Sequence, residues 1–130
     1  MDPERPHMRI LIVETQESLG ALWQRALQRR GASVWLAHGH SEAEELIQQG
    51  DFDVIVLDVI IDGGSALALA DLASFRLPSC RVVFVTDTTF FSDGTIFNYF
   101  ANAAALLSTS TPTDDLVALV EHHAAADGRA

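Results

Sequence analysis

Four short runs rich in β-branched residues, separated by segments with helical spacing, constrain the fold of this chain more than any other feature of its sequence. The runs are Arg9–Val13, Ser33–Ala37, Asp53–Leu57 and Arg81–Val85. Strands that alternate with helices indicate parallel βαβ units. Two of the runs are apolar over Ile10–Val13 and Val54–Leu57 without interruption, as strands covered by helices on both faces must be. We therefore expect a parallel sheet in which these two strands are central.

The segments between the runs carry helical signals. An apolar stripe followed by Gly31, a helix stop, predicts a first helix; the stripe consists of Leu19, Leu22, Trp23, Ala26 and Leu27. Ser41, with Glu44 three residues later, has the capping-box pattern and predicts a second helix over Glu42–Gln49. A third helix, with a weaker apolar face, is predicted over Ala66–Phe75.

The last third of the chain is less clearly marked. Ser92 or Asp93 can cap a fourth helix, one side of which is formed by Ile96, Phe97, Phe100 and Ala104. Ala105–Ser108 is short enough to be a fifth strand, and Pro112 suits the first position of a fifth helix. With right-handed crossovers, this pattern predicts an α/β fold of the flavodoxin-like type: a doubly wound five-stranded parallel sheet of order 2-1-3-4-5 with five helices.

Composition excludes several classes of function. The 130 residues have a formal net charge of -10, which would repel a nucleic acid or an anionic membrane. The one cysteine, Cys80, cannot form an intramolecular disulfide, so we expect a reducing, cytoplasmic location. No apolar run is long enough to cross a bilayer. We expect one domain over residues 8–125, with a disordered leader over 1–7 and a disordered tail over 126–130.

Ligands of an open parallel sheet bind beyond the carboxyl ends of its strands, so the residues there are candidates for chemistry. They are Glu14, Thr15, Asp58, Thr86, Asp87, Ser108 and Thr109. Carboxylates on neighbouring strands repel each other unless a cation lies between them or one is protonated. Glu14 and Asp58 together therefore indicate a divalent metal site, with a solvated Glu14 as the alternative. His38 and His40 have no third ligand in view, and we interpret them as part of a polar loop.

Over essentially the whole predicted domain, the sequence resembles the receiver domain of two-component response regulators. Four segments carry the resemblance, in the order and spacing of that family: ILIVET, DVIVLDVIIDGGSAL, VVFVTD and ALLSTSTPTDDL. The resemblance implies that Asp58 accepts a phosphoryl group from a histidine kinase or a histidine phosphotransferase. It also implies that Thr86 is the switch hydroxyl and that Thr109 occupies the position of the family's lysine. Glu14, Asp58 and the main-chain carbonyl of Ile60 would then hold Mg²⁺.

Several residues depart from the family pattern. Thr15 replaces an acid that usually contacts Mg²⁺, and Thr109 replaces the lysine that would pair with the acyl phosphate. Asp87 stands beside the switch threonine, where its carboxylate opposes a phosphoryl group unless it is a further metal ligand. Asp62 occupies the usual proline position of the following loop, and Leu106 replaces an aromatic switch residue. These departures mark an atypical receiver and predict weak Mg²⁺ binding and impaired phosphorylation.

Three interpretations of function follow. The leading one is a stand-alone receiver domain in a phosphorelay, a signalling module and not an enzyme. The second is a pseudo-receiver that binds its partner whether or not it is phosphorylated. The rival class is a flavodoxin-type cofactor carrier, but the loop ETQESLG after the first strand has two acids and one late glycine, which suits a phosphate poorly.

Aromatic residues indicate a partner surface. Five of the eight Phe and Tyr residues lie between Phe90 and Phe100, on and just before the predicted fourth helix. Grouped exposed aromatics usually mark a binding site. We expect a homodimer or a target protein to bind the surface formed by this helix, the strand Ala105–Ser108 and the helix after Pro112.

Overall fold

A five-stranded parallel sheet forms the centre of the computed structural model, which describes residues 8–87 and 101–126. The strand order is β2-β1-β3-β4-β5, and every neighbouring pair is parallel. The predicted order 2-1-3-4-5 is therefore confirmed. The strands are β1 (Arg9–Val13), β2 (Ser33–Ala37), β3 (Val54–Asp58), β4 (Arg81–Thr86) and β5 (Ala103–Ser108).

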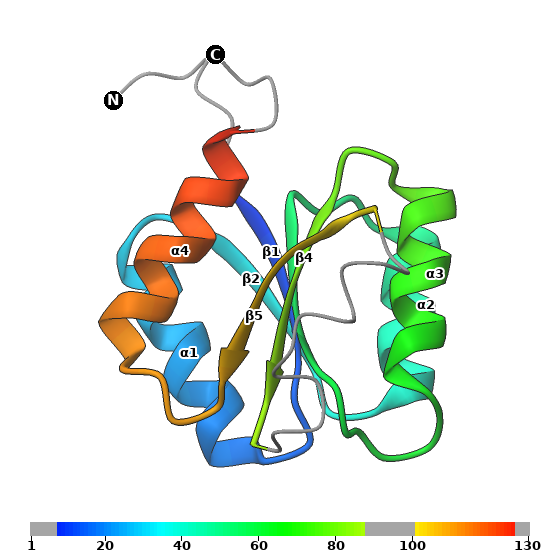
Figure 1. Ribbon diagram of the computed structural model, residues 1–130, viewed down its shortest axis with the longest axis horizontal. Coiled ribbons are helices and arrows are strands. Elements are labelled where there is room, and N and C mark those ends of the chain that lie inside the picture. Colours follow the sequence, from blue (N-terminus) through cyan, green and yellow to red (C-terminus); the bar gives the residue numbers. More distant parts are fainter. Residues whose placement is uncertain (1–7, 88–100, 127–130) are drawn as a thin grey trace.

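Four helices within the described residues cover the two faces of this sheet. They are α1 (Glu17–Arg29), α2 (His40–Gln49), α3 (Ala66–Arg76) and α4 (Thr113–Ala126). Helices α1 and α4 pack on one face, and α2 and α3 pack on the other (Figure 1). The predicted fourth helix falls on residues outside the described ranges, apart from its last member: Ala104 lies in β5, which begins at Ala103 and not at Ala105.

The central strands are apolar throughout because each buries both of its faces. In β1, Leu11 and Val13 belong to the core under α2 and α3, whereas Ile10 and Ile12 belong to the core under α1 and α4. All four side chains are fully buried. Alternating side chains of a strand point to opposite faces, so a strand between two helical layers has no polar position to offer.

Two predicted helix starts differ from the structure. Ser41 lies inside the first turn of α2 and does not cap it, because Gly39 is the N-cap residue. Glu42 Oε1 instead accepts a hydrogen bond from the main-chain N–H of His38 (2.9 Å). At the other end of the chain, α4 begins at Thr113, one residue after Pro112.

The amino end of α2 is held by a neighbouring loop. His40, predicted to lie in a polar loop, is the first residue of α2. Its main-chain N–H donates to the carbonyl of Asp62 (2.9 Å), in the loop that follows β3. The end of α1 agrees with prediction, since Gly31 follows the helix with a φ of +92°, a conformation that glycine adopts without steric cost.

No helix among residues 8–87 and 101–126 is long and apolar enough to cross a bilayer.

Candidate functional site

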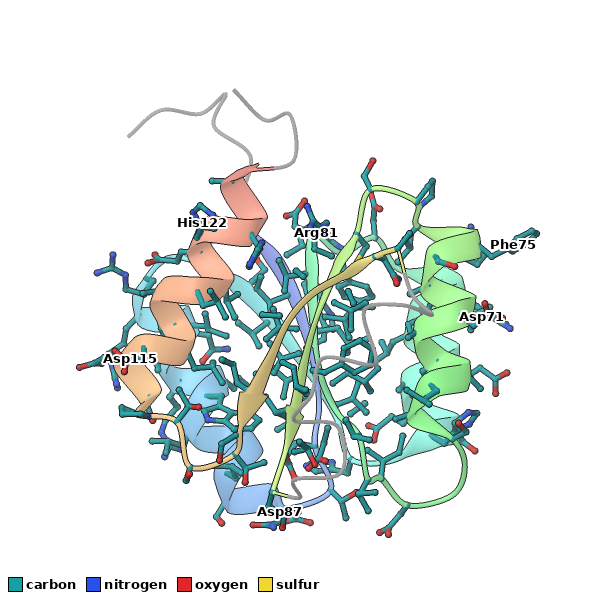
Figure 2. All side chains as sticks on the ribbon, viewed as in Figure 1. Asp71, Phe75, Arg81, Asp87, Asp115 and His122 are labelled. Atoms are coloured by element: carbon teal, nitrogen blue, oxygen red, sulfur yellow. The ribbon has the colours of Figure 1, made fainter. Side chains whose placement is uncertain are left out.

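The carboxyl ends of β1, β3 and β4 bring the acidic candidates to one edge of the sheet. Glu14 follows β1, Asp58 is the last residue of β3 and pairs with Val85, and Asp87 follows β4. Figure 2 shows Asp87 at this edge and Arg81, at the start of β4, at the opposite edge. These acids therefore lie at the carboxyl ends of the strands, as the sequence predicted.

Burial separates the acids of this site. Glu14 is 1% exposed and Asp58 is 8% exposed, while Asp87 is exposed. The alternative that Glu14 is a solvated acid is therefore wrong. Thr86, the last residue of β4, is also buried, and it follows Val85, the residue that pairs with Asp58.

The charge of Glu14 is poorly compensated. Burial, followed by the hydrogen-bonding contact with the Asp58 carboxyl and the charges of Asp58 and Asp87, raises the pKa of Glu14 from 4.5 to about 8. The main-chain N–H of Gln16 donates to Glu14 Oε2 (3.1 Å) and opposes this rise. Within the described residues, no hydrogen-bond donor lies against Glu14 Oε1, which is buried. A proton or a cation between the two carboxyl groups would satisfy it.

The Asp58 carboxylate is oriented by the loop that follows it. Its Oδ1 accepts a hydrogen bond from the main-chain N–H of Ile60 (2.9 Å). The main-chain N–H of Val59 donates to the carbonyl of Val85 (2.9 Å), which continues the pairing of β3 with β4 past the last strand residue. The start of the loop is thereby fixed to the sheet.

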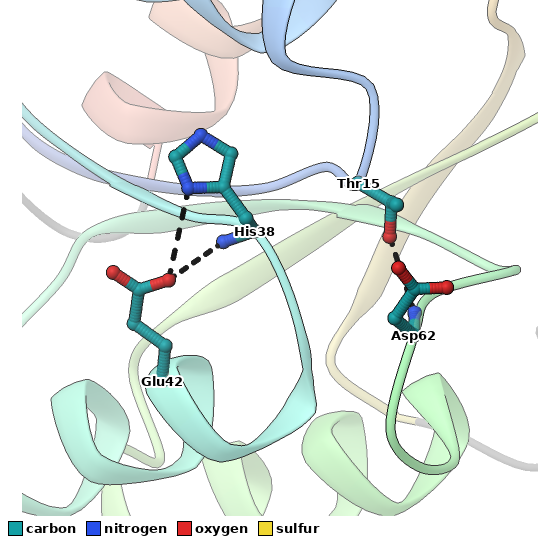
Figure 3. Close-up of polar contacts among 4 residues, drawn as sticks. All are labelled: Thr15, His38, Glu42 and Asp62. Atoms are coloured by element: carbon teal, nitrogen blue, oxygen red, sulfur yellow. Dashed lines mark hydrogen bonds and ion pairs between the residues drawn. The ribbon is translucent and has the colours of Figure 1, made fainter.

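Thr15, in the loop between β1 and α1, contacts the loop that follows Asp58. Its Oγ1 accepts a hydrogen bond from the main-chain N–H of Asp62 (3.1 Å), as Figure 3 shows. Sequence reasoning missed this contact. The available signal was the pair of departures itself, because a proline at position 62 would have no N–H to donate.

The position of the family's lysine carries no positive charge. Thr109 is half-buried, and its main-chain N–H donates to the carbonyl of Thr86 (3.0 Å). The hydroxyls of Ser108 and Ser110 lie 2.7 Å apart beside it. Leu106, at the second position where the family has a switch residue, is half-buried against the core under α2 and α3.

Positive charge lies at the other end of the described structure. The chain contains no lysine. Arg9 and Arg81 begin β1 and β4, and Arg76 ends α3. The remaining described arginines lie in the second half of α1 or at its C-cap: Arg25, Arg29 and Arg30. Helices of a parallel α/β sheet run back toward the amino ends of the strands, so these side chains belong to the edge opposite Asp58.

The acidic residues fit a hard cation that takes only a few of its ligands from the protein. Mg²⁺ usually keeps several waters and takes one or two carboxylates, which Glu14 and Asp58 can supply. Within the part of the chain that the structure describes, no group of three or more His, Cys, Asp or Glu side chains is placed to hold a metal. The Thr15 hydroxyl already bonds Asp62. Among residues 8–87 and 101–126, the arrangement therefore offers two carboxylates and a buried oxygen that no hydrogen-bond donor contacts.

Comparison with known proteins assigns the family. Residues 10–121 match the response regulator receiver domain. The chain belongs to this family. A receiver domain is a non-enzymatic module of two-component signal transduction, whose partner in general is a histidine kinase. Membership of this family displaces the rival interpretation of a flavodoxin-type cofactor carrier.

Individual relatives are distant. An uncharacterized transcriptional regulatory protein, YkoG of Bacillus subtilis (strain 168), is 34% identical over 58 residues, which are 45% of this chain and 25% of that protein. This chain thus matches about a quarter of the length of that relative.

Solved receiver structures share the fold. A CheY-like receiver domain protein from Methanospirillum hungatei JF-1 aligns with a TM-score of 0.86 and 19% identity, over 95% of this chain and 98% of that one. The non-phosphorylated HemR receiver domain of Leptospira biflexa aligns with a TM-score of 0.79 and 25% identity, over 90% of this chain and 94% of that one. The Thermotoga maritima response regulator TrrA, solved in complex with Mg²⁺ and BeF, aligns with a TM-score of 0.77 and 23% identity, over 89% of this chain and 98% of that one.

Proposed function

We propose that this chain is an atypical receiver domain whose phosphoacceptor is Asp58 and whose phosphorylation is slow or incomplete. The observation that carries the proposal is the charge distribution of the site. Asp58 lies beside the buried Glu14, whose Oε1 receives no hydrogen bond from a donor in the described part of the chain, and the described arginines lie at the other edge of the sheet. Such a site can hold a cation, but it offers a phosphoryl dianion little compensation of its own.

The proposed reaction is an in-line phosphoryl transfer. The Asp58 carboxylate attacks the phosphorus of a phosphohistidine donor, the P–N bond breaks, and the imidazole leaves and takes up a proton. The Ile60 N–H bond to Oδ1 orients the carboxylate for this attack. The Thr86 hydroxyl donates to one oxygen of the transferred phosphoryl group.

Mg²⁺ is the cofactor that we infer for this transfer. Glu14, Asp58 and the main-chain carbonyl of Ile60 would hold it, with Asp87 as a further ligand. When bound, the ion neutralises the equatorial oxygens of the phosphoryl group. The relative from Thermotoga maritima, solved with Mg²⁺ and BeF, supports a metal-dependent reaction. We expect weak binding here, because Thr15 supplies a hydroxyl that already bonds Asp62.

Two substitutions account for the impaired modification. Thr109 cannot make the charge-assisted contact that a lysine would, and hydrogen bonds to charged groups contribute on the order of 1.5–3 kcal/mol. Asp87 adds a negative charge close enough to raise the pKa of Glu14, so it also opposes an incoming dianion unless the metal screens it.

A pseudo-receiver that binds its partner without phosphorylation is the second candidate. It is favoured by the hydrogen bonds through which Asp62 joins the loops of the site to one another. A receiver whose loops are held in one arrangement by such hydrogen bonds can present one surface to a partner regardless of modification.

The partners that we infer are a histidine kinase or a histidine phosphotransferase, together with a second copy or a target protein. The proposed surface for the latter consists of the segment around residues 92–104, β5 and α4. The aromatic residues between Phe90 and Phe100 lie outside the described residues. In the described part, β5 is an edge strand whose residues are all half-buried or exposed, which supports a contact there. We infer a cytoplasmic location, as is typical of receiver domains.

Intact-mass measurement tests the proposal. The protein is incubated with acetyl phosphate and Mg²⁺, and Asp58→Ala is treated in parallel. We expect a slow, incomplete addition of one phosphoryl group that is absent from Asp58→Ala. Rapid stoichiometric addition would contradict the impaired reaction, addition that persists in Asp58→Ala would overturn the assignment of Asp58, and no addition at all would favour the pseudo-receiver.

A further inference from the structure

Both main-chain groups of Asp62 are hydrogen-bonded to other loops of the site. Its N–H donates to Thr15 Oγ1 (3.1 Å), in the loop between β1 and α1 (Figure 3). Its carbonyl accepts from the N–H of His40 (2.9 Å), at the start of α2, and Gly39 forms an isolated parallel bridge with it. Asp62 therefore joins three loops at the carboxyl edge of the sheet.

Two glycines at this junction leave little or no room for a side chain. A Cβ atom at Gly39 would lie 3.2 Å from the carbonyl oxygen of Asp62, and a Cβ atom at Gly64 would lie 2.6 Å from Cγ of His40. Gly63, between Asp62 and Gly64, has a φ of +87°, which also favours glycine. The close approach of the loops is thus built into the local sequence.

The junction lies next to the group that orients Asp58. Ile60, whose N–H bonds Asp58 Oδ1, is two residues before Asp62 on the same short loop. The loop is hydrogen-bonded on both sides of Ile60, at Val59 to β4 and at Asp62 to Thr15 and His40. The position of the Ile60 N–H, and with it the direction of the Asp58 carboxylate, depends on both attachments.

We propose that Thr15 is a positioning residue: its hydroxyl accepts a hydrogen bond from the main-chain N–H of Asp62 and thereby holds the loop that orients Asp58. This inference deepens the proposed function, and it relies on that function only for the role of Asp58 as phosphoacceptor. It also explains why two departures from the family pattern occur together. A threonine at position 15 can hold the loop only if position 62 has an N–H, which proline lacks.

Amide hydrogen exchange measured by NMR, without Mg²⁺ and without a phosphodonor, tests this role. Thr15→Val removes the acceptor with little change in shape, and we expect exchange at the amides of Asp62 and Ile60 to become about three- to tenfold faster, as expected for one hydrogen bond. Thr15→Ser keeps the hydroxyl and should restore slow exchange. Amides in β4, such as that of Val83, should not change, which separates local positioning from loss of stability.

Position 62 offers a matched pair of variants. Asp62→Ala keeps the main-chain N–H and should leave Ile60 exchange unchanged, whereas Asp62→Pro removes the N–H and should accelerate it as Thr15→Val does. Equal exchange at Ile60 in the wild type and in Thr15→Val would overturn the proposal, as would acceleration by Asp62→Ala. Because no phosphodonor is used, these results stand whether or not Asp58 proves to be the phosphoacceptor.

Discussion

At the scale of single residues, the burial of Glu14 beside Asp58 makes the folded state sensitive to pH. The folded chain raises the pKa of Glu14 from 4.5 to about 8, so the unfolded chain releases this proton first as the pH rises. The stability that this group contributes is present in full below pH 4.5 and is lost as the pH rises to about 8. Raising the pH therefore lowers the contribution of Glu14 to the free energy of unfolding.

We predict that Glu14→Gln removes this dependence. The free energy of unfolding, measured with urea and without divalent ions, should fall more steeply in the wild type than in Glu14→Gln between pH 4.5 and about 8. Asp58→Ala should shift the wild-type window to lower pH, because the hydrogen-bonding contact and the charge of Asp58 both raise the pKa of Glu14. Parallel curves for the wild type and Glu14→Gln would contradict the prediction.

At the scale of helices and strands, the sheet could be predicted because its signals are local. The uninterrupted apolar runs at Ile10–Val13 and Val54–Leu57 are typical of strands buried on both faces, and the structure places them between two helical layers. The start of α2 could not be predicted from its own sequence. The capping-box pattern at Ser41 competes with the carbonyl of Asp62, which accepts from His40 and places the helix start earlier.

The site divides in the same way. Asp58 and Glu14 could be placed because each follows a strand that the sequence marks. The bond between Thr15 and Asp62 could not, since it joins residues 47 positions apart and depends on how closely two loops approach. Hydrogen bonds across such distances follow from the packed fold, and neither residue type alone indicates them.

The two serines near helix starts provide a prediction at this scale. Ser65 caps α3, since its Oγ accepts from the N–H of Ala68 (3.2 Å), whereas Ser41 lies within α2 and is exposed. We expect Ser65→Ala to lower the free energy of unfolding by about 1 kcal/mol. Ser41→Ala should change it by less than about 0.5 kcal/mol. Chemical denaturation compares the two, and a larger loss in Ser41→Ala would show that the cap is at Ser41 after all.

At the scale of the whole molecule, charge is divided between the two edges of the sheet. The net charge is -10, yet the described arginines lie toward the amino ends of the strands, and Glu14, Asp58 and Asp87 lie at the carboxyl ends. Charges at opposite edges of the domain are screened from each other by water and salt. The arginines therefore offer the site almost no compensation, and the local charge decides how well a phosphoryl group is held.

We predict that Thr109→Lys combined with Asp87→Ala increases both the yield and the rate of Asp58 phosphorylation by acetyl phosphate in the presence of Mg²⁺. The rate should rise on the order of tenfold or more. The estimate takes one charge-assisted hydrogen bond to contribute about 1.5–3 kcal/mol to the transition state. The matched control is Gln28→Lys with Gln49→Lys, which changes the net charge by the same amount at exposed positions near the ends of α1 and α2. Time courses of intact mass for the two double variants separate local from overall charge. If the control raises the rate as much as the site variant does, the net charge of the domain limits phosphorylation, and the missing lysine does not.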